Sequence, residues 1–165
     1  MNNTFFYKSS ITIGSPIGSL TIFTDGYHIT ELKIQDFIPA DYEKKTHKSL
    51  LYNAAQQIDL YFNGELQEFN LPIKLNDTLF RKKVWDRLLK IPFGSQSTYK
   101  EIAYALKTAP RPIGNACGAN PIPLIVPCHR VIGKDGKIGG FSAGSGSDTK
   151  RWLLNHEAAV MNKQP

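Results

Sequence analysis

The spacing of apolar residues changes about a third of the way along this 165-residue chain, and that change restricts the fold more than any other feature. Three segments before residue 35 are rich in aromatic and β-branched residues: 4–13, 19–24 and 28–34. From Leu51 to Phe62 the apolar residues instead recur every three to four positions. These spacings predict three strands, followed by one helix laid on their sheet.

Residues 76–165 are expected to be mainly helical. Thr78 and Thr98 can each cap a helix, and a third short helix can run from Pro112 to about Gly118. Two short helices joined tightly in a basic region are typical of a helix-turn-helix, although such pairs are also common packing units. The helix after Thr78 is expected to turn five apolar residues inward: Phe80, Val84, Trp85, Leu88 and Leu89.

Together these segments predict an α+β protein of two domains. Residues 1–75 would form a small antiparallel sheet with its helix, a supporting domain, and residues 76–165 a mainly helical domain. Segment 69–75 alternates, but Pro72 makes it an edge strand or an extended connection.

The net charge of +6 is unevenly distributed between these parts. Residues 1–75 hold 6 basic and 8 acidic residues, a balance of −2, whereas residues 76–165 hold 14 basic and 6 acidic residues, a balance of +8. An anionic partner is therefore expected to meet the second part.

Composition excludes several classes of protein. Two cysteines, Cys117 and Cys128, are too few for a disulfide framework and lack the spacing of a structural zinc site, so no metal is expected. No signal peptide or membrane-spanning run is apparent, which favours a cytoplasmic protein. No glycine-rich nucleotide loop is present, so no diffusible cofactor is expected.

One segment carries specific chemistry. An apolar run ends at Pro127 and is followed by Cys128 and His129. An imidazole near a thiol stabilises the thiolate, and a carboxylate such as Glu157 could orient that imidazole. A cysteine hydrolase uses the same relay, and a bare cysteine-histidine pair is more often structural, so this pattern alone does not choose the reaction.

The segment Pro127-Cys128-His129-Arg130-Val131 resembles the acceptor-site signature of the O6-alkylguanine-DNA alkyltransferases, also called methylated-DNA–protein-cysteine methyltransferases. Flanking matches occur in the same order over about residues 78–157. They are Phe80, Val84-Trp85, Ile91-Pro92-Phe93-Gly94, Thr98-Tyr99, Ile102-Ala103, Arg111, Ile113-Gly114-Asn115-Ala116, Asn120-Pro121, Gly139-Gly140-Phe141-Ser142, Lys150, Trp152-Leu153-Leu154 and His156-Glu157.

The resemblance implies a ribonuclease-H-like first domain, a winged-helix-like second domain, and irreversible transfer of the alkyl group from O6-alkylguanine, and from O4-alkylthymine, to Cys128. The thiol proton would leave towards His129, supported by Glu157, and Asn120 would brace the acceptor turn. Tyr99 would donate to guanine N3. The base pocket it implies consists of Tyr99, Val131, Phe141 and Ser142, with Phe141 where a tyrosine is common.

The resemblance also implies that a monomer binds double-stranded DNA through the minor groove. Arg111 would fill the stack that the flipped nucleotide leaves. The DNA-binding residues it implies are Arg111, Pro112, Gly114, Asn115, Ala116 and Arg130. Cys117 has no chemical role in this set and is interpreted as a small packing residue.

Two alternatives remain beside this function. One is a cysteine hydrolase using Cys128, His129 and Glu157, and the other is a DNA-binding module that senses lesions without repairing them. Without the resemblance to the family, Tyr99 would be interpreted as a core aromatic residue and Arg111 as a charged residue of a loop. Glu157 would then be a solvated carboxylate at a helix end.

Overall fold

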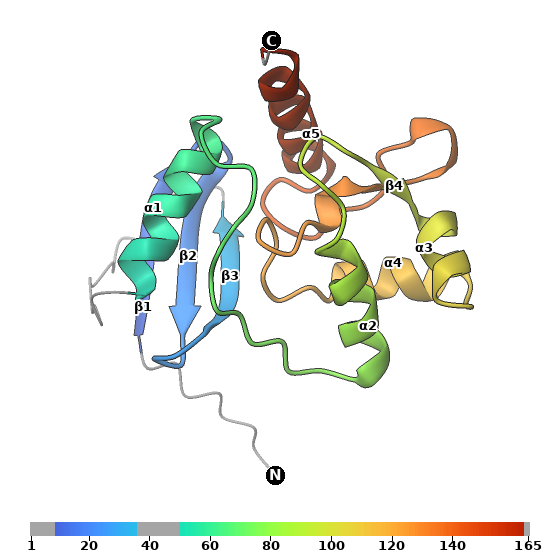
Figure 1. The fold of residues 1–165 in the computed structure, drawn as a ribbon, viewed down its shortest axis with the longest axis horizontal. Helices are drawn as coiled ribbons and strands as arrows, with labels where there is room; N and C mark the ends of the chain where they lie inside the picture. Colours follow the sequence, from blue (N-terminus) through green and yellow to red (C-terminus); the bar gives the residue numbers. More distant parts are fainter. Residues whose placement is uncertain (1–8, 36–49, 164–165) are drawn as a thin grey trace. The chain divides into compact units, whose positions relative to one another are not determined.

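The computed structural model of the chain describes residues 9–35 and 50–163 (Figure 1). The chain divides into two compact units, Met1–Lys74 and Leu75–Pro165, and each is described by itself. The boundary proposed from the sequence, after Leu75, lies one residue beyond this division. The first residues of the predicted strand 4–13 lie outside the described part.

The first unit contains a three-stranded antiparallel sheet in the order β1-β2-β3. Its strands are β1 (Ser9–Ser15), β2 (Gly18–Thr24) and β3 (Ile29–Gln35). Ser15 pairs with Gly18, so β1 and β2 are joined by a tight turn. Gly18 has a φ of 108°, which lies in the region that favours glycine, and this explains its place at the end of the turn.

Helix α1 (Leu50–Phe62) packs against β1 and β2, across one face of the sheet (Figure 1). Its apolar spacing buries Leu51, Ala54, Ile58 and Tyr61 against a sheet whose Leu20 and Ile22 are also fully buried. The segment after the helix is an extended connection, since it forms one isolated bridge, between Ile73 and Ile29. The predicted sheet with one covering helix is therefore confirmed.

The second unit is mainly helical. Its helices are α2 (Leu79–Leu88), α3 (Tyr99–Ala105), α4 (Pro110–Gly118) and α5 (Ser147–Asn162), with short 3-10 turns η1 (Cys128–Arg130) and η2 (Lys134–Gly136). Two short strands, β4 (Ser97–Thr98) and β5 (Val131–Ile132), pair in parallel. Helices α3 and α4 pack against each other and are joined through residues 106–109. No helix among the described residues is long and apolar enough to cross a membrane.

The two threonine caps form as expected. The Thr78 hydroxyl accepts from the Arg81 amide at 3.3 Å. Thr98 and Glu101 form a capping box, in which the Thr98 hydroxyl accepts from the Glu101 amide and the Glu101 carboxylate accepts from the Thr98 amide. These local bonds fix where α2 and α3 begin.

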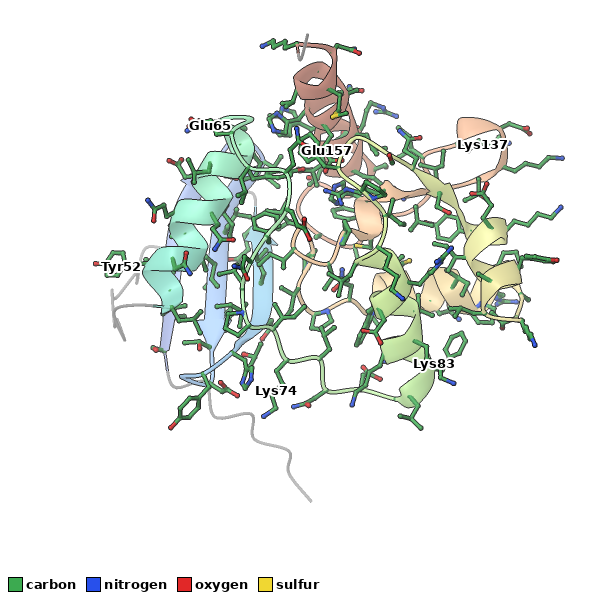
Figure 2. All side chains as sticks on the ribbon, viewed as in Figure 1. Tyr52, Glu65, Lys74, Lys83, Lys137 and Glu157 are labelled. Carbon is green, nitrogen blue, oxygen red and sulfur yellow. The ribbon has the colours of Figure 1, made fainter. Side chains whose placement is uncertain are left out.

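The inward face of α2 is narrower than predicted. Val84, Trp85 and Leu88 are fully buried, but Phe80 and Leu89 are 37% and 42% exposed, so the prediction is wrong for these two residues. At about 100° per residue, Phe80 and Leu89 lie at opposite edges of the buried stripe. Lys83 lies on the exposed side of the helix (Figure 2).

Two helix boundaries also differ from expectation. Helix α4 begins at Pro110, so Arg111 lies in its first turn and not in a preceding loop. Helix α5 runs five residues past Glu157, so this carboxylate lies inside the helix and not at its end.

Candidate functional site

Asn120 holds the segment that carries Cys128. Its side-chain amide donates to the Val126 carbonyl at 2.8 Å and to the Cys128 sulfur at 3.2 Å, while its oxygen accepts from the Ile122 amide at 3.0 Å. The chain from 122 to 126 is thereby closed into a compact turn that ends at Cys128. An N–H group aimed at the sulfur also stabilises its thiolate form.

A buried network surrounds the carboxylate of Glu157, which projects from α5 (Figure 2). His129 Nε2 lies 2.7 Å from Glu157 Oε1, Arg130 Nε donates to both carboxylate oxygens, and the Gly94 amide donates to Oε2 at 2.9 Å. Burial raises the pKa of Glu157, but the bonds from His129 and Arg130 outweigh it and lower the pKa to about 2. Glu157 is therefore ionised at neutral pH.

His129 is fully buried and neutral at pH 7. Burial lowers the pKa of its imidazole, although Glu157 opposes this effect. With the carboxylate next to Nε2, the proton belongs on that nitrogen and Nδ1 carries the lone pair. Nδ1 has no hydrogen-bond partner among the described residues, so it is available as a base.

Arg130 belongs to this network and not to a DNA-facing surface. Its guanidinium binds Glu157 through Nε and Nη2, Nη1 donates to the Ile91 carbonyl at 2.7 Å, and only 6% of the residue is exposed. The prediction that Arg130 contacts DNA is therefore wrong. Its charge is instead needed inside, because a buried carboxylate requires a cationic partner.

Cys128 lies on the wall of a cavity of about 830 Å³. Residues of α3, α4, η1 and the loop after β5 line it: Tyr99, Lys100, Pro110, Arg111, Gly114, Asn115, Cys117, Gly118, Cys128, Gly133, Lys134, Gly140, Phe141 and Ser142. Of the predicted base pocket, Tyr99, Phe141 and Ser142 line this cavity. Val131 is not among the lining residues, and its side chain is fully buried; its contact with the base through the backbone stays a prediction.

The exposed side of α4 carries Arg111 and Asn115, with Pro112 and Gly114 half-buried. Ala116 is 1% exposed, and its carbonyl accepts from Trp85 Nε1 at 2.9 Å. Ala116 thus faces α2, and its predicted contact with DNA is wrong. It attaches α4 to the core.

Two residues that had no site role in the sequence lie at or next to the cavity: Cys117 lines it, and Lys150 contacts Tyr99, which lines it. Cys117 follows Gly114 by one helical turn, a spacing that places both on one face of α4 and could have revealed it. Lys150 is fully buried, and its ammonium donates to the Tyr99 hydroxyl at 3.3 Å. Helical spacing places Lys150 on the same face of α5 as Leu153 and Glu157. The spacing of this buried face therefore indicates an inward-facing lysine.

The thiols are protonated at rest. Burial raises the pKa of Cys128, and the bond from Asn120 and the charge of Lys150 partly oppose it. Burial is also the main reason that the pKa of Cys117 is raised to about 12. Attack by Cys128 therefore requires a base to take its proton, and His129 is the neutral base next in the chain.

No group of three or more histidine, cysteine or carboxylate side chains within residues 9–35 and 50–163 could hold a metal ion. The chemistry at the cavity wall rests on the Cys128 thiol, the His129 imidazole and their hydrogen-bond partners. Such an arrangement suits transfer of a group to sulfur.

Comparisons with known proteins show which family this chain is similar to. Residues 9–75 match the model of the 6-O-methylguanine DNA methyltransferase ribonuclease-like domain, and residues 79–159 match that of the DNA-binding domain of the same family. The methylated-DNA–protein-cysteine methyltransferase of Mycobacterium tuberculosis is 42% identical over 150 residues, which cover 88% of this chain and 90% of the relative. That of Methanosarcina barkeri is 41% identical over 152 residues, covering 88% and 94%.

Solved structures give the same result. The M. tuberculosis protein OGT, crystallised in complex with DNA, superposes with a TM-score of 0.76 at 40% identity, covering 90% of this chain and 92% of that one. An O6-methylguanine DNA methyltransferase from Methanococcus jannaschii superposes with a TM-score of 0.64 at 30% identity, covering 90% and 93%. By its two domain matches, its curated relatives and its fold, this chain belongs to the methylated-DNA–protein-cysteine methyltransferase family.

Proposed function

We propose that this protein repairs DNA by moving the alkyl group of O6-alkylguanine, and of O4-alkylthymine, onto Cys128. The observation that carries the proposal is a buried thiol on a cavity wall, next in sequence to a neutral imidazole that an ionised carboxylate holds. Sulfur attacks the alkyl carbon, a sulfur–carbon bond forms, and the carbon–oxygen bond to the base breaks. The stable thioether ends the activity of that molecule, so each protein acts once.

His129 accepts the thiol proton at Nδ1, directly or through one water. Glu157 holds the opposite nitrogen and stabilises the positive charge that develops on the ring. Asn120 donates to the same sulfur and favours its anionic form. Proton removal and attack are thereby coupled at one atom.

The departing base needs a proton as well. In this proposal Tyr99 donates to guanine N3, while Phe141 and Ser142 hold the base within the cavity. The net change is that the thiol loses a proton, the base gains one, and the alkyl group passes from oxygen to sulfur. No diffusible cofactor enters this balance.

The alkyl carbon is out of reach inside a duplex, so the base must be flipped out. Arg111 and Asn115 on the exposed side of α4, with Pro112 and Gly114 beside them, would lie in the minor groove. Arg111 also lines the cavity that would receive the base, which suits a side chain that fills the vacated stack. We infer that a monomer acts in the cytoplasm, where DNA is accessible and thiols stay reduced.

The test uses an oligonucleotide duplex containing O6-methylguanine and the intact mass of the protein after mixing. We expect a gain of one methyl group per molecule, mapped to the peptide with Cys128 and absent in Cys128→Ser. Methylation mapped to Cys117 would overturn the choice of acceptor. Loss of the lesion with an unmodified protein, or repeated turnover of an ester or amide, would favour a hydrolase instead. Binding of the lesion without loss of the methyl group would favour a sensor.

A further inference from the structure

Cys117 is a buried thiol that the proposed alkyl transfer does not use. It lies in the last turn of α4 and lines the same cavity as Cys128, and the two residues are only 9% and 5% exposed. They are the two cysteines of the whole sequence, and both are free thiols. Two thiols on the wall of one cavity can react with each other, which gives the site a chemistry that one thiol lacks.

Asn120 connects the two cysteines. Its backbone amide donates to the Cys117 carbonyl at 3.2 Å, and its side-chain amide donates to the Cys128 sulfur, also at 3.2 Å. Residues 118–127 join the cysteines, and the further bond from Asn120 to the Val126 carbonyl folds this segment back on itself. Asn120 therefore holds Cys128 next to the turn of α4 that carries Cys117.

The electrostatics of the thiols agree with this proximity. Burial is the main reason that the pKa of each thiol is raised, and the charge of Cys128 raises the pKa of Cys117 further. The ammonium of Lys150 lowers the pKa of both thiols. Because such interactions weaken with distance, the two sulfur atoms lie in one small region of the cavity wall.

We propose that Cys128 has a second reaction, with hydrogen peroxide, and that Cys117 resolves its product into a disulfide. In the first step the Cys128 sulfur attacks one peroxide oxygen, the oxygen–oxygen bond breaks, and a sulfenic acid and one water form. In the second step the Cys117 sulfur attacks the sulfenic sulfur, whose hydroxyl leaves as a second water. The two thiols lose two electrons, the peroxide gains them, and the two thiol hydrogens leave in the waters.

The groups around Cys128 suit attack on a peroxide oxygen as they suit attack on an alkyl carbon. Within the described residues His129 Nδ1 has no hydrogen-bond partner and can take the thiol proton, and Asn120 stabilises the anionic sulfur. Hydrogen peroxide is small and uncharged, so it can enter a cavity of about 830 Å³. The disulfide preserves a thiol that is used once, because thiol reductants restore it, whereas a sulfinic acid stays oxidised.

The experiment measures the intact mass and the peptide map of the wild type and of Cys117→Ser after exposure to hydrogen peroxide. We expect the wild-type monomer to lose two hydrogens and to contain a bridge between Cys117 and Cys128. Cys117→Ser should instead be oxidised at Cys128 to the sulfinic or sulfonic acid. After dithiothreitol, the wild type should recover its methyl transfer, and Cys117→Ser should recover roughly tenfold less, each relative to its own untreated sample.

Gly118→Ala is the matched control. It changes the next residue of α4, where an added Cβ would meet no other described atom within 4 Å outside its chain neighbours and its own helix. This variant should form the bridge as the wild type does. If Cys117→Ser does not fold, Cys117→Ala provides the same comparison.

Three results would overturn the proposal. A sulfinic acid at Cys128 of the wild type, or a disulfide between two molecules, would show that Cys117 cannot reach the sulfenic sulfur. Equal recovery of the wild type and Cys117→Ser would show that Cys117 protects nothing. The mass and the peptide map do not depend on DNA repair, so a wild type that forms the bridge but transfers no methyl group would contradict the proposed function alone.

Discussion

The interiors of the two units differ in chemistry. In the described part of the first unit the buried polar residues are Ser9, Ser19 and Thr24, which are all uncharged. In the described part of the second unit, four histidine, arginine, lysine or glutamate side chains are buried: His129, Arg130, Lys150 and Glu157. Apolar burial stabilises both units, but ionisable groups add a desolvation cost that only their partners offset. The interior of the second unit therefore depends on the pairing of its charged groups, and the described interior of the first unit does not.

Removal of Glu157 is expected to have the largest effect on the interior of the second unit. Glu157→Ala leaves Arg130 and His129 buried without their carboxylate, and we expect a loss of about 3–5 kcal/mol in the free energy of unfolding. Both tryptophans, Trp85 and Trp152, lie in the second unit, so urea unfolding followed by tryptophan fluorescence measures it there. An unchanged midpoint would show that the network adds nothing to stability.

Leu20 offers a matched substitution in the interior of the first unit. Leu20 is fully buried in β2, and Leu20→Ala is expected to lower the free energy of unfolding by about 2–5 kcal/mol through the cavity it leaves. The loss should appear in far-ultraviolet circular dichroism. The rate of methyl transfer per folded molecule should stay at the wild-type value, in contrast to Glu157→Ala, and a large drop in that rate would contradict a purely supporting unit.

Low pH is expected to lower the stability of the second unit by a smaller amount than the substitutions do. In the folded protein the pKa of Glu157 is lowered to about 2 from its ordinary value of 4.5, so its contribution to stability is present above pH 4.5 and is lost as the pH falls towards 2. Between pH 5 and pH 3 this amounts to about 2 kcal/mol. His129, whose pKa burial lowers, adds to the loss because the unfolded imidazole takes up a proton first. We expect the tryptophan-monitored stability to fall over this range and Glu157→Gln to flatten the slope; equal slopes would exclude Glu157 as the source.

Features set by neighbouring residues were predictable from the sequence. The caps at Thr78 and Thr98 depend on bonds spanning three residues, and the apolar spacing of α1 depends on the helix alone. The resemblance of segment 127–131 identified the family, and with it the chemistry expected at Cys128. These expectations needed no knowledge of which elements meet.

Features set by packing between distant segments could not be predicted. Whether Arg130 faces DNA or Glu157 depends on where α5 places Glu157, 27 residues further along the chain. The sequence alone allows Ala116 on the outer face of α4. In the structure Trp85 of α2 donates to its carbonyl, which places the residue on the inner face. The same holds for Phe80 and Leu89, because α2 has apolar residues on a wider arc than its neighbours cover. The charged interior of the second unit is thus a property of the assembled fold.

The early start of α4 has a consequence for the kinetics of DNA encounter. Arg111 lies between Pro110 and Pro112 within the first helical turn, so two fixed φ angles and the helix itself restrict its backbone. The conformational entropy of this segment is therefore lost on folding and not when DNA arrives. In the proposed role Arg111 would reach the duplex from a preorganised backbone, and the association rate would then depend on diffusion and charge more than on loop rearrangement.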